Sequence, residues 1–145
     1  MIIQLTSDDI VKYFDQIKYA ASQVNAIDLD NLPVYAQNLL NSFLSGNLQC
    51  WVVLSEDRAI KSILITKIYL DIFNKSHLMI DMAYGYSPTT ETDKIEGVEE
   101  LKKFAKNQNI TGKDAIIAYT NNQIAVNAMI KMGMKEIYKV FSAEV

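Results

Sequence analysis

Hydrophobic and polar residues change their spacing along the chain, and these changes predict a series of secondary-structure elements. A short apolar start over residues 1–5 is typical of a strand. Apolar residues at steps of three and four then predict one amphipathic helix over residues 6–24. A second helix is expected from Asp30 to about residue 44, with Pro33 tolerated in its first turn. One strand is therefore followed by two helices.

The middle of the chain alternates apolar and polar residues with a period of two. Turn sequences at residues 55–58 and 73–76 divide residues 48–84 into three strands, which predicts an antiparallel meander. One face of its middle strand should pack against the rest of the protein, and the other face should be more exposed to solvent. The apolar side chains expected on the packed face are Leu64, Ile68, Leu70 and Ile72.

The last third predicts two helices that alternate with strands. Residues 85–97 are polar and irregular, and a helix is expected from Val98 to about residue 108. The apolar run 115–119 fits a buried strand, and residues 122–132 fit a helix that ends at a glycine. A closing strand is expected over residues 135–141.

The element order is therefore β-α-α-β-β-β-α-β-α-β over a single domain, residues 1–145. This order predicts an α/β (α+β) fold with a mixed sheet, antiparallel first and parallel later, and with helices on both faces.

Composition and charge narrow the classes of function. Half of the residues are hydrophobic and 21% are charged, which is too apolar for disorder, while no apolar run approaches the ~20 residues of a membrane span. A net charge of −3 argues against a nucleic-acid partner. The start of the chain lacks the layout of a secretion signal, so a cytoplasmic location is expected. The single cysteine, Cys50, should be a buried side chain, and with one histidine no metal site is expected.

The last predicted helix contains the sequence Asn122-Gln-Ile-Ala125-Val-Asn-Ala-Met129-Ile-Lys131-Met-Gly133-Met134. It resembles the pattern Asn-x-x-Ala-x-x-x-Tyr-x-Lys-x-Gly-Phe of the GNAT superfamily, the acyl-CoA-dependent N-acetyltransferases, whose element order is also similar. The resemblance implies a GNAT-like fold and, for an active member, acetyl-CoA as the cofactor. The matching residues also have purely structural interpretations, since Asn122 could be an N-cap and Gly133 a helix terminator.

The family's cofactor loop is not recognisable here. Active members hold the CoA pyrophosphate in a Gln/Arg-x-x-Gly-x-Gly/Ala loop, where small residues let backbone N–H groups approach the phosphates. Residues 85–97 contain no such motif, and the acids Glu91, Asp93 and Glu96 place negative charge there instead. We therefore expect no cofactor. Were one bound, the candidate contacts would be Thr89, Thr90, Thr92, Lys94 and Asn122.

The catalytic residues of the family are not recognisable here either. Met129 stands where many members have a tyrosine that protonates the departing thiolate, and a thioether has no acidic proton. Tyr119 or Tyr138 could substitute from a neighbouring strand. The candidate general base is Asp81, whose pKa would rise if its apolar neighbours bury it, although an outward-facing carboxylate is the simpler interpretation.

Two other acids, Asp71 and Glu91, are alternative bases, and His77 beside a hairpin turn is expected to be exposed to solvent. The sequence therefore predicts a non-catalytic GNAT-like structural or interaction protein, within a virus particle or another assembly. Its partner would be another protein or a second copy of the chain. The alternative is an active acetyltransferase with a divergent cofactor loop and an unidentified acceptor.

Overall fold

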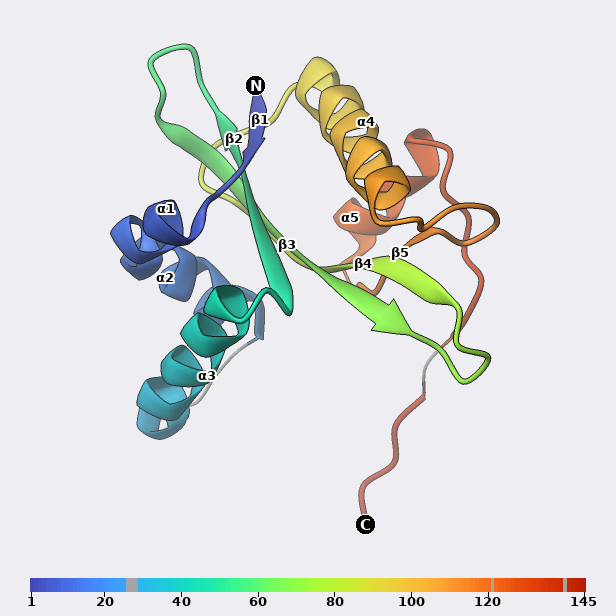
Figure 1. The fold of residues 1–145 in the computed structure, drawn as a ribbon, viewed down its shortest axis with the longest axis horizontal. Helices are drawn as coiled ribbons and strands as arrows, with labels where there is room; N and C mark the ends of the chain where they lie inside the picture. Colours follow the sequence, from blue (N-terminus) through green and yellow to red (C-terminus); the bar gives the residue numbers. More distant parts are fainter. Residues whose placement is uncertain (26–28, 121, 140) are drawn as a thin grey trace.

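The described residues form five strands and five α-helices. Figure 1 shows how these elements are arranged. The computed structural model describes residues 1–25, 29–120, 122–139 and 141–145. In chain order the elements are β1 (Ile2–Gln4), α1 (Ser7–Lys12), α2 (Phe14–Asn25), the 3-10 turn η1 (Leu29–Asn31), α3 (Leu32–Leu44), β2 (Leu48–Leu54), β3 (Ile60–Leu70), β4 (Ser76–Gly85), α4 (Glu91–Asn107), β5 (Ile116–Ala118) and α5 (Gln123–Lys131).

The strands form one mixed sheet in the order β1-β2-β3-β4-β5. The first four are antiparallel to their neighbours, while β5 pairs with β4 in parallel. The predicted meander and the change from antiparallel to parallel pairing are thus confirmed. Strands β1 and β5 lie at the two edges of the sheet and have one strand neighbour each.

Helices cover both faces of the sheet, as expected. On one face, α1, α2 and α3 bury residues such as Ile17 and Phe43 against Val52, Ile63 and Met82. On the other face, α4 packs against the alternate side chains of the same strands. The indole N–H of Trp51 donates to Thr66 Oγ1 at 3.0 Å, and that hydroxyl donates to Gln49 Oε1 at 3.0 Å. These three polar side chains therefore bond one another on the α4 side of the sheet, between β2 and β3.

The helix expected over residues 6–24 is in fact two helices. The N-cap prediction is confirmed, because Thr6 and Asp9 form a capping box at the start of α1. The helical run then breaks at Tyr13, so that α2 begins one residue later. Ile10 before the break and Ile17 after it both lie in the same hydrophobic core.

The expected packing of the middle strand is wrong towards its end. Ile63 and Ile65 are buried, whereas Leu70 and Ile72 are 56% and 90% exposed. The register shifts between Ile65 and Thr66, and the hairpin that follows extends beyond the helices. Ile63 and Ile65 lie on the side of the strand that was expected to be more exposed to solvent, and Ile68 on the expected packed side is 42% exposed. Alternation therefore found the period of the strand but not which side is buried.

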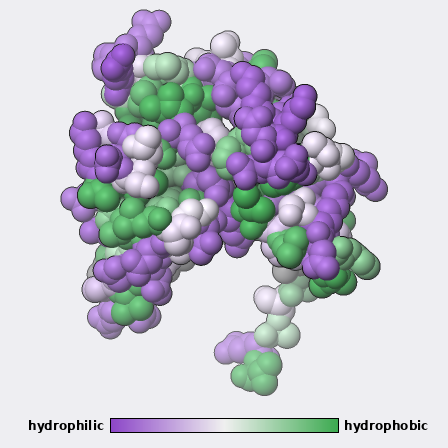
Figure 2. All heavy atoms as spheres, in the orientation of Figure 1, coloured by the Kyte–Doolittle hydropathy of each residue, from purple (hydrophilic) through white to green (hydrophobic). Residues whose placement is uncertain are grey.

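The closing strand expected over residues 135–141 is not present in the described part of the chain. Residues 134–139 and 141–145 belong to no helix or strand. Figures 1 and 2 show this C-terminal segment leaving the body of the protein, with apolar atoms at its end. Separately, none of the described helices has the length and apolar content needed to cross a bilayer.

Candidate functional site

The parallel strands β4 and β5 separate soon after they pair. Their register joins Leu78 to Ile116 and ends where Ile80 meets Ala118. On its other side β4 pairs with β3 throughout. Ile80 lies opposite Thr66 and Met82 lies opposite Ile65, which leaves Asp81 as an extra residue with no partner in β3. This β-bulge coincides with the point where β5 turns away. Openings beyond the carboxyl ends of parallel strands are the usual ligand sites in open α/β sheets.

Asp81 does not have the burial that a desolvated general base requires. Its side chain is 43% exposed, and its carboxylate lies 3.4 Å from the Lys67 ammonium group. The suggestion that apolar neighbours would bury this group is therefore wrong. The outward-facing interpretation is confirmed, and the pair is an ordinary surface ion pair.

The two candidate general acids lie apart from regular structure. Tyr119 directly follows β5 and is 53% exposed, while Tyr138 is 70% exposed in the C-terminal segment. Tyr138 was expected on a neighbouring strand, and no strand forms there in the described residues. Neither hydroxyl has a hydrogen-bond partner within the described chain, so nothing orients either group for proton transfer.

Helix α4 begins seven residues earlier than expected, which changes the interpretation of the cofactor-loop region. Thr90 is its N-cap, so Thr92 and Lys94 lie in the first helical turn and not in an irregular loop. Thr92 is exposed and Thr89 is half-buried, while Lys94 lies 3.8 Å from the carboxylate of Glu91. The polar composition of this segment thus reflects a helix start with acidic residues, which is a common pattern.

The N-terminus of α4 is occupied by a carboxylate of the chain itself. Asp93 accepts from the Thr90 backbone N–H at 2.9 Å, and Thr90 Oγ1 accepts from the Asp93 N–H at 3.1 Å, which completes a capping box. The Lys61 ammonium group lies 2.5 Å from the Asp93 carboxylate. These contacts, the lysine first, lower the Asp93 pKa to about 2. A phosphate would meet this fixed negative charge where helix N-termini usually attract anions.

The N-terminus of α5 is capped by Asn122. Its Oδ1 atom accepts from the backbone N–H of Ile124 at 2.9 Å and of Ala125 at 3.3 Å. The N-cap interpretation of Asn122 is therefore confirmed, and Gly133 has the positive φ of +85° expected of a helix terminator. Met129, at the position of the family's tyrosine, is half-buried.

His77 is buried, and the expectation that it would be exposed is wrong. The side chain bridges two segments: Nε2 lies 2.8 Å from Asp71 Oδ2, and Nδ1 lies 2.6 Å from the carbonyl oxygen of Asp114. Both partners can only accept, so both contacts are hydrogen bonds only when the imidazole carries two protons. The Asp71 carboxylate raises the His77 pKa, and the histidine in turn lowers the Asp71 pKa.

Sequence reasoning missed this contact because Asp114 is far along the chain in the loop before β5. The sequence could have indicated only the pairing of Asp71 with His77, because these two residues face each other across one hairpin. The Lys75 ammonium group also reaches this loop, at the carbonyl of Lys113. The cluster therefore joins the β3–β4 hairpin to the loop that leads into β5, and Asp71 acts there as a structural acceptor.

The described part of the chain contains neither a reactive thiol nor a cluster of metal-binding side chains. Cys50 is buried as expected, and burial raises its thiol pKa to about 12, which keeps it protonated. No group of three histidine, cysteine or acidic side chains among the described residues is arranged to hold a metal ion.

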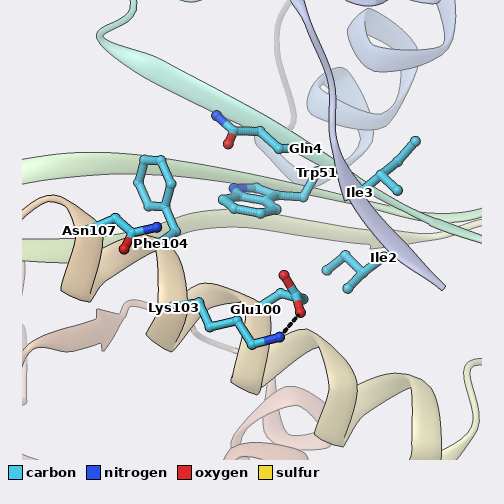
Figure 3. Close-up of a pocket in the computed structure, with 8 residues that line it drawn as sticks. All are labelled: Ile2, Ile3, Gln4, Trp51, Glu100, Lys103, Phe104 and Asn107. Carbon is cyan, nitrogen blue, oxygen red and sulfur yellow. Dashed lines mark hydrogen bonds and ion pairs between the residues drawn. The ribbon is translucent and has the colours of Figure 1, made fainter.

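A hollow of about 410 Å³ lies between β1 and α4. Figure 3 shows the side chains that line it, with the indole of Trp51 and the ring of Phe104 close together. These two rings are 5.3 Å apart between centroids and meet edge to face. Gln4 lies at the rim on the strand side, and the Lys103–Glu100 ion pair lies on the helix side.

Solved structures are similar to this chain over its whole length. The aminoglycoside 6'-N-acetyltransferase AAC(6')-Ih from Acinetobacter baumannii has a TM-score of 0.74 at 12% identity, covering 100% of this chain and 97% of that one. AAC(6')-IG from Acinetobacter haemolyticus has a TM-score of 0.67 at 14% identity, covering 100% and 99%. AAC(6')-Iy, in a complex with CoA, has a TM-score of 0.68 at 11% identity, covering 100% and 93%. No family model and no curated protein matches the sequence.

Proposed function

Because this chain has the GNAT fold, we propose that it uses this fold as a non-catalytic interaction module within a protein assembly, such as a virus particle. The observation that carries the proposal is the Asp93 carboxylate at the N-terminus of α4, held by Thr90 and Lys61. It accepts from the Thr90 N–H, one of the backbone donors at this helix start, and its low pKa keeps it charged at neutral pH, which disfavours a diphosphate there.

The catalytic candidates support the same proposal. The exposed Asp81 carboxylate lacks the desolvation that would tune it as a base, and Met129 cannot protonate a thiolate. Tyr119 and Tyr138 are exposed and unoriented. Among the described residues, these candidates therefore supply neither a desolvated base nor an oriented acid for acyl transfer.

One observation favours the alternative, an active acetyl-CoA-dependent N-acetyltransferase. Strands β4 and β5 separate after Ile80 beside the bulge at Asp81, so an opening between strands is present. The similar AAC(6')-Iy is in complex with CoA. In this alternative the cofactor would lie between these strands, with Thr89 and Lys94 near its phosphates.

Calorimetric titration of the whole chain with acetyl-CoA and with CoA separates the two functions. We expect no saturable heat at ligand concentrations up to the millimolar range. A dissociation constant in the micromolar range or below would overturn the non-catalytic proposal.

The role of Asp93 is tested with Asp93→Asn, which keeps an acceptor at the helix start but removes its charge. If the carboxylate is what excludes the diphosphate, this variant binds CoA more tightly than the wild type. The matched control is Glu91→Gln, which removes a charge from the same helical turn at a side chain that is 70% exposed. Equal changes in both variants would show that overall charge, and not the capped helix end, controls binding.

A further inference from the structure

The outer edge of β1 carries backbone groups without partners. In an antiparallel pair the hydrogen-bonded positions alternate along each strand. The Leu54 N–H donates to the carbonyl of Met1 at 2.8 Å, and the Leu5 N–H donates to the carbonyl of Cys50 at 2.9 Å. The backbone groups of Ile2 and Gln4 therefore point away from β2, towards the open edge of the sheet.

Part of this edge is already used, and the rest is free. The Ile2 N–H lies 3.4 Å from Glu96 Oε1 of α4. The backbone N–H and C=O of Gln4 have no hydrogen-bond partner within the described chain. An exposed edge of this kind is a template for another strand, as in peptide recognition by β-strand addition.

The hollow between β1 and α4 runs beside this edge. A strand added to β1 would direct alternate side chains towards Trp51 and Phe104, which line the hollow (Figure 3). Trp51 is 4% exposed and anchors the sheet side of the hollow. The site therefore offers both main-chain hydrogen bonds and a place for an apolar side chain.

The C-terminal segment, residues 135–145, has the properties of a strand without a partner. Apart from the Lys139–Glu136 ion pair, its described residues make no hydrogen bond or ion pair. Ile137, Phe141 and Val145 fall on one side of an extended chain, and Phe141 is 88% exposed. If all eleven residues of the segment were extended, they would span about 36 Å, whereas the three residues of β1 span about 10 Å. The segment is therefore long enough to pair along the whole of β1.

This segment starts from the end of α5, on the far side of the protein from β1. The Gly133 N–H donates to the carbonyl of Ile130 at 3.0 Å and the Met134 N–H to that of Met129 at 3.0 Å, which is a Schellman motif. Strand β1 lies at the opposite edge of the sheet from β5, and α4 lies between β1 and the C-terminal segment in Figure 1. The segment is therefore directed outwards, away from the β1 edge of its own chain.

We infer that the C-terminal segment of one copy adds as a strand to the β1 edge of a second copy, with Phe141 entering the hollow beside Trp51 and Phe104. This specifies the partner in the assembly role proposed above and rests on it. The donor segment and the acceptor edge are different surfaces, so the contact is head-to-tail and can extend into longer chains of copies.

Sedimentation velocity of the full chain over a range of concentrations tests the contact. We expect the wild type and Gln4→Ala to associate, because both keep the backbone N–H at residue 4. Gln4→Pro removes this donor without touching a hydrogen bond to β2, and should weaken association at least tenfold. Phe141→Asp should weaken it similarly without disturbing the fold of its own copy, because Phe141 is 88% exposed there.

A synthetic peptide of residues 135–145 supplies a second measurement on the full chain. In excess it should dissociate the oligomers and shift the emission of Trp51, which is the only tryptophan. The inference is overturned if the wild type is monomeric at all concentrations, if Gln4→Pro and Phe141→Asp both associate like the wild type, or if the peptide leaves Trp51 unchanged. Titration of the same samples with CoA shows independently whether the non-catalytic proposal fails.

Discussion

Strand β3 and helix α5 were equally clear in the hydrophobic pattern, yet they bury their apolar residues to different degrees. In β3, Ile63 is fully buried between strands β2 and β4 and beneath the helices. In α5 no residue is buried, and Ile130 remains 58% exposed. The periodicity of hydrophobic residues therefore shows which side of an element is apolar, while the burial of that side depends on what other elements cover it.

The largest difference in stability is expected between two alanine substitutions, one in β3 and one in α5. Ile63→Ala should lower the free energy of unfolding by about 3 kcal/mol, because it leaves a cavity that closely packed strands cannot close. Ile130→Ala should lower it by less than about 0.5 kcal/mol. Chemical denaturation of both variants measures the difference, at protein concentrations where the chain is monomeric. Similar losses would show that α5 is as much a part of the core as β3.

A smaller effect is expected at the capped start of α4. Asp93→Asn should lower the free energy of unfolding by about 1 kcal/mol at neutral pH, because it removes a charged acceptor from a helix N-terminus. The folded pKa of Asp93, about 2, lies below its usual value of 3.8. Its contribution is therefore present above pH 3.8 and is lost as the pH falls towards 2. Denaturation curves of the variant and the wild type should converge over that range.

The His77 contact should make stability depend on pH in the neutral range. Asp71 raises the pKa of His77 above its usual value of 6.5, so the contribution is complete below pH 6.5 and is lost as the pH rises through the folded pKa. Denaturation midpoints of the wild type should fall from pH 6 to pH 8.5. His77→Gln should show a clearly smaller fall, and a fall as large as that of the wild type would refute the assignment.

The smallest effect is expected at Asp81. Asp81→Asn removes half of an exposed ion pair with Lys67, so the free energy of unfolding should change by less than about 0.5 kcal/mol. Thermal melting of this variant beside Asp93→Asn compares an exposed carboxylate with a capping one. A large loss at Asp81 would mean that the bulge in β4 depends on its carboxylate.

Much of the fold followed from local pattern. The meander, the helix that ends at Gly133 and the Thr6 cap were predicted correctly, because each depends on residues close together in the chain. The start of α4 was placed too late, because its first turn is polar and its apolar side begins only further along. The closing strand was expected from composition, but a strand forms only with a partner, and the described residues 135–139 have none.

The candidate site was less predictable than the fold. The absence of a glycine loop could be read directly from residues 85–97, but the capping role of Asp93 required the helix start to be known. The burial considered for Asp81 and the solvent exposure expected of His77 were both wrong, although the outward-facing alternative for Asp81 was right. Asp81 stands opposite a register shift, and His77 meets Asp114 from 37 residues away, so neither environment is encoded in neighbouring residues.

By itself, the sequence determined most of the order of the elements from the first strand to the last helix, the GNAT-like arrangement and the lack of a small-residue phosphate loop, since backbone preference and hydrophobic period act over a few residues. Only the tertiary structure decided that Lys61 would hold Asp93 at the start of α4 and that Gln4 would present free backbone groups beside Trp51. Those features depend on which segments meet and which are left uncovered, and that is set by packing over the whole chain.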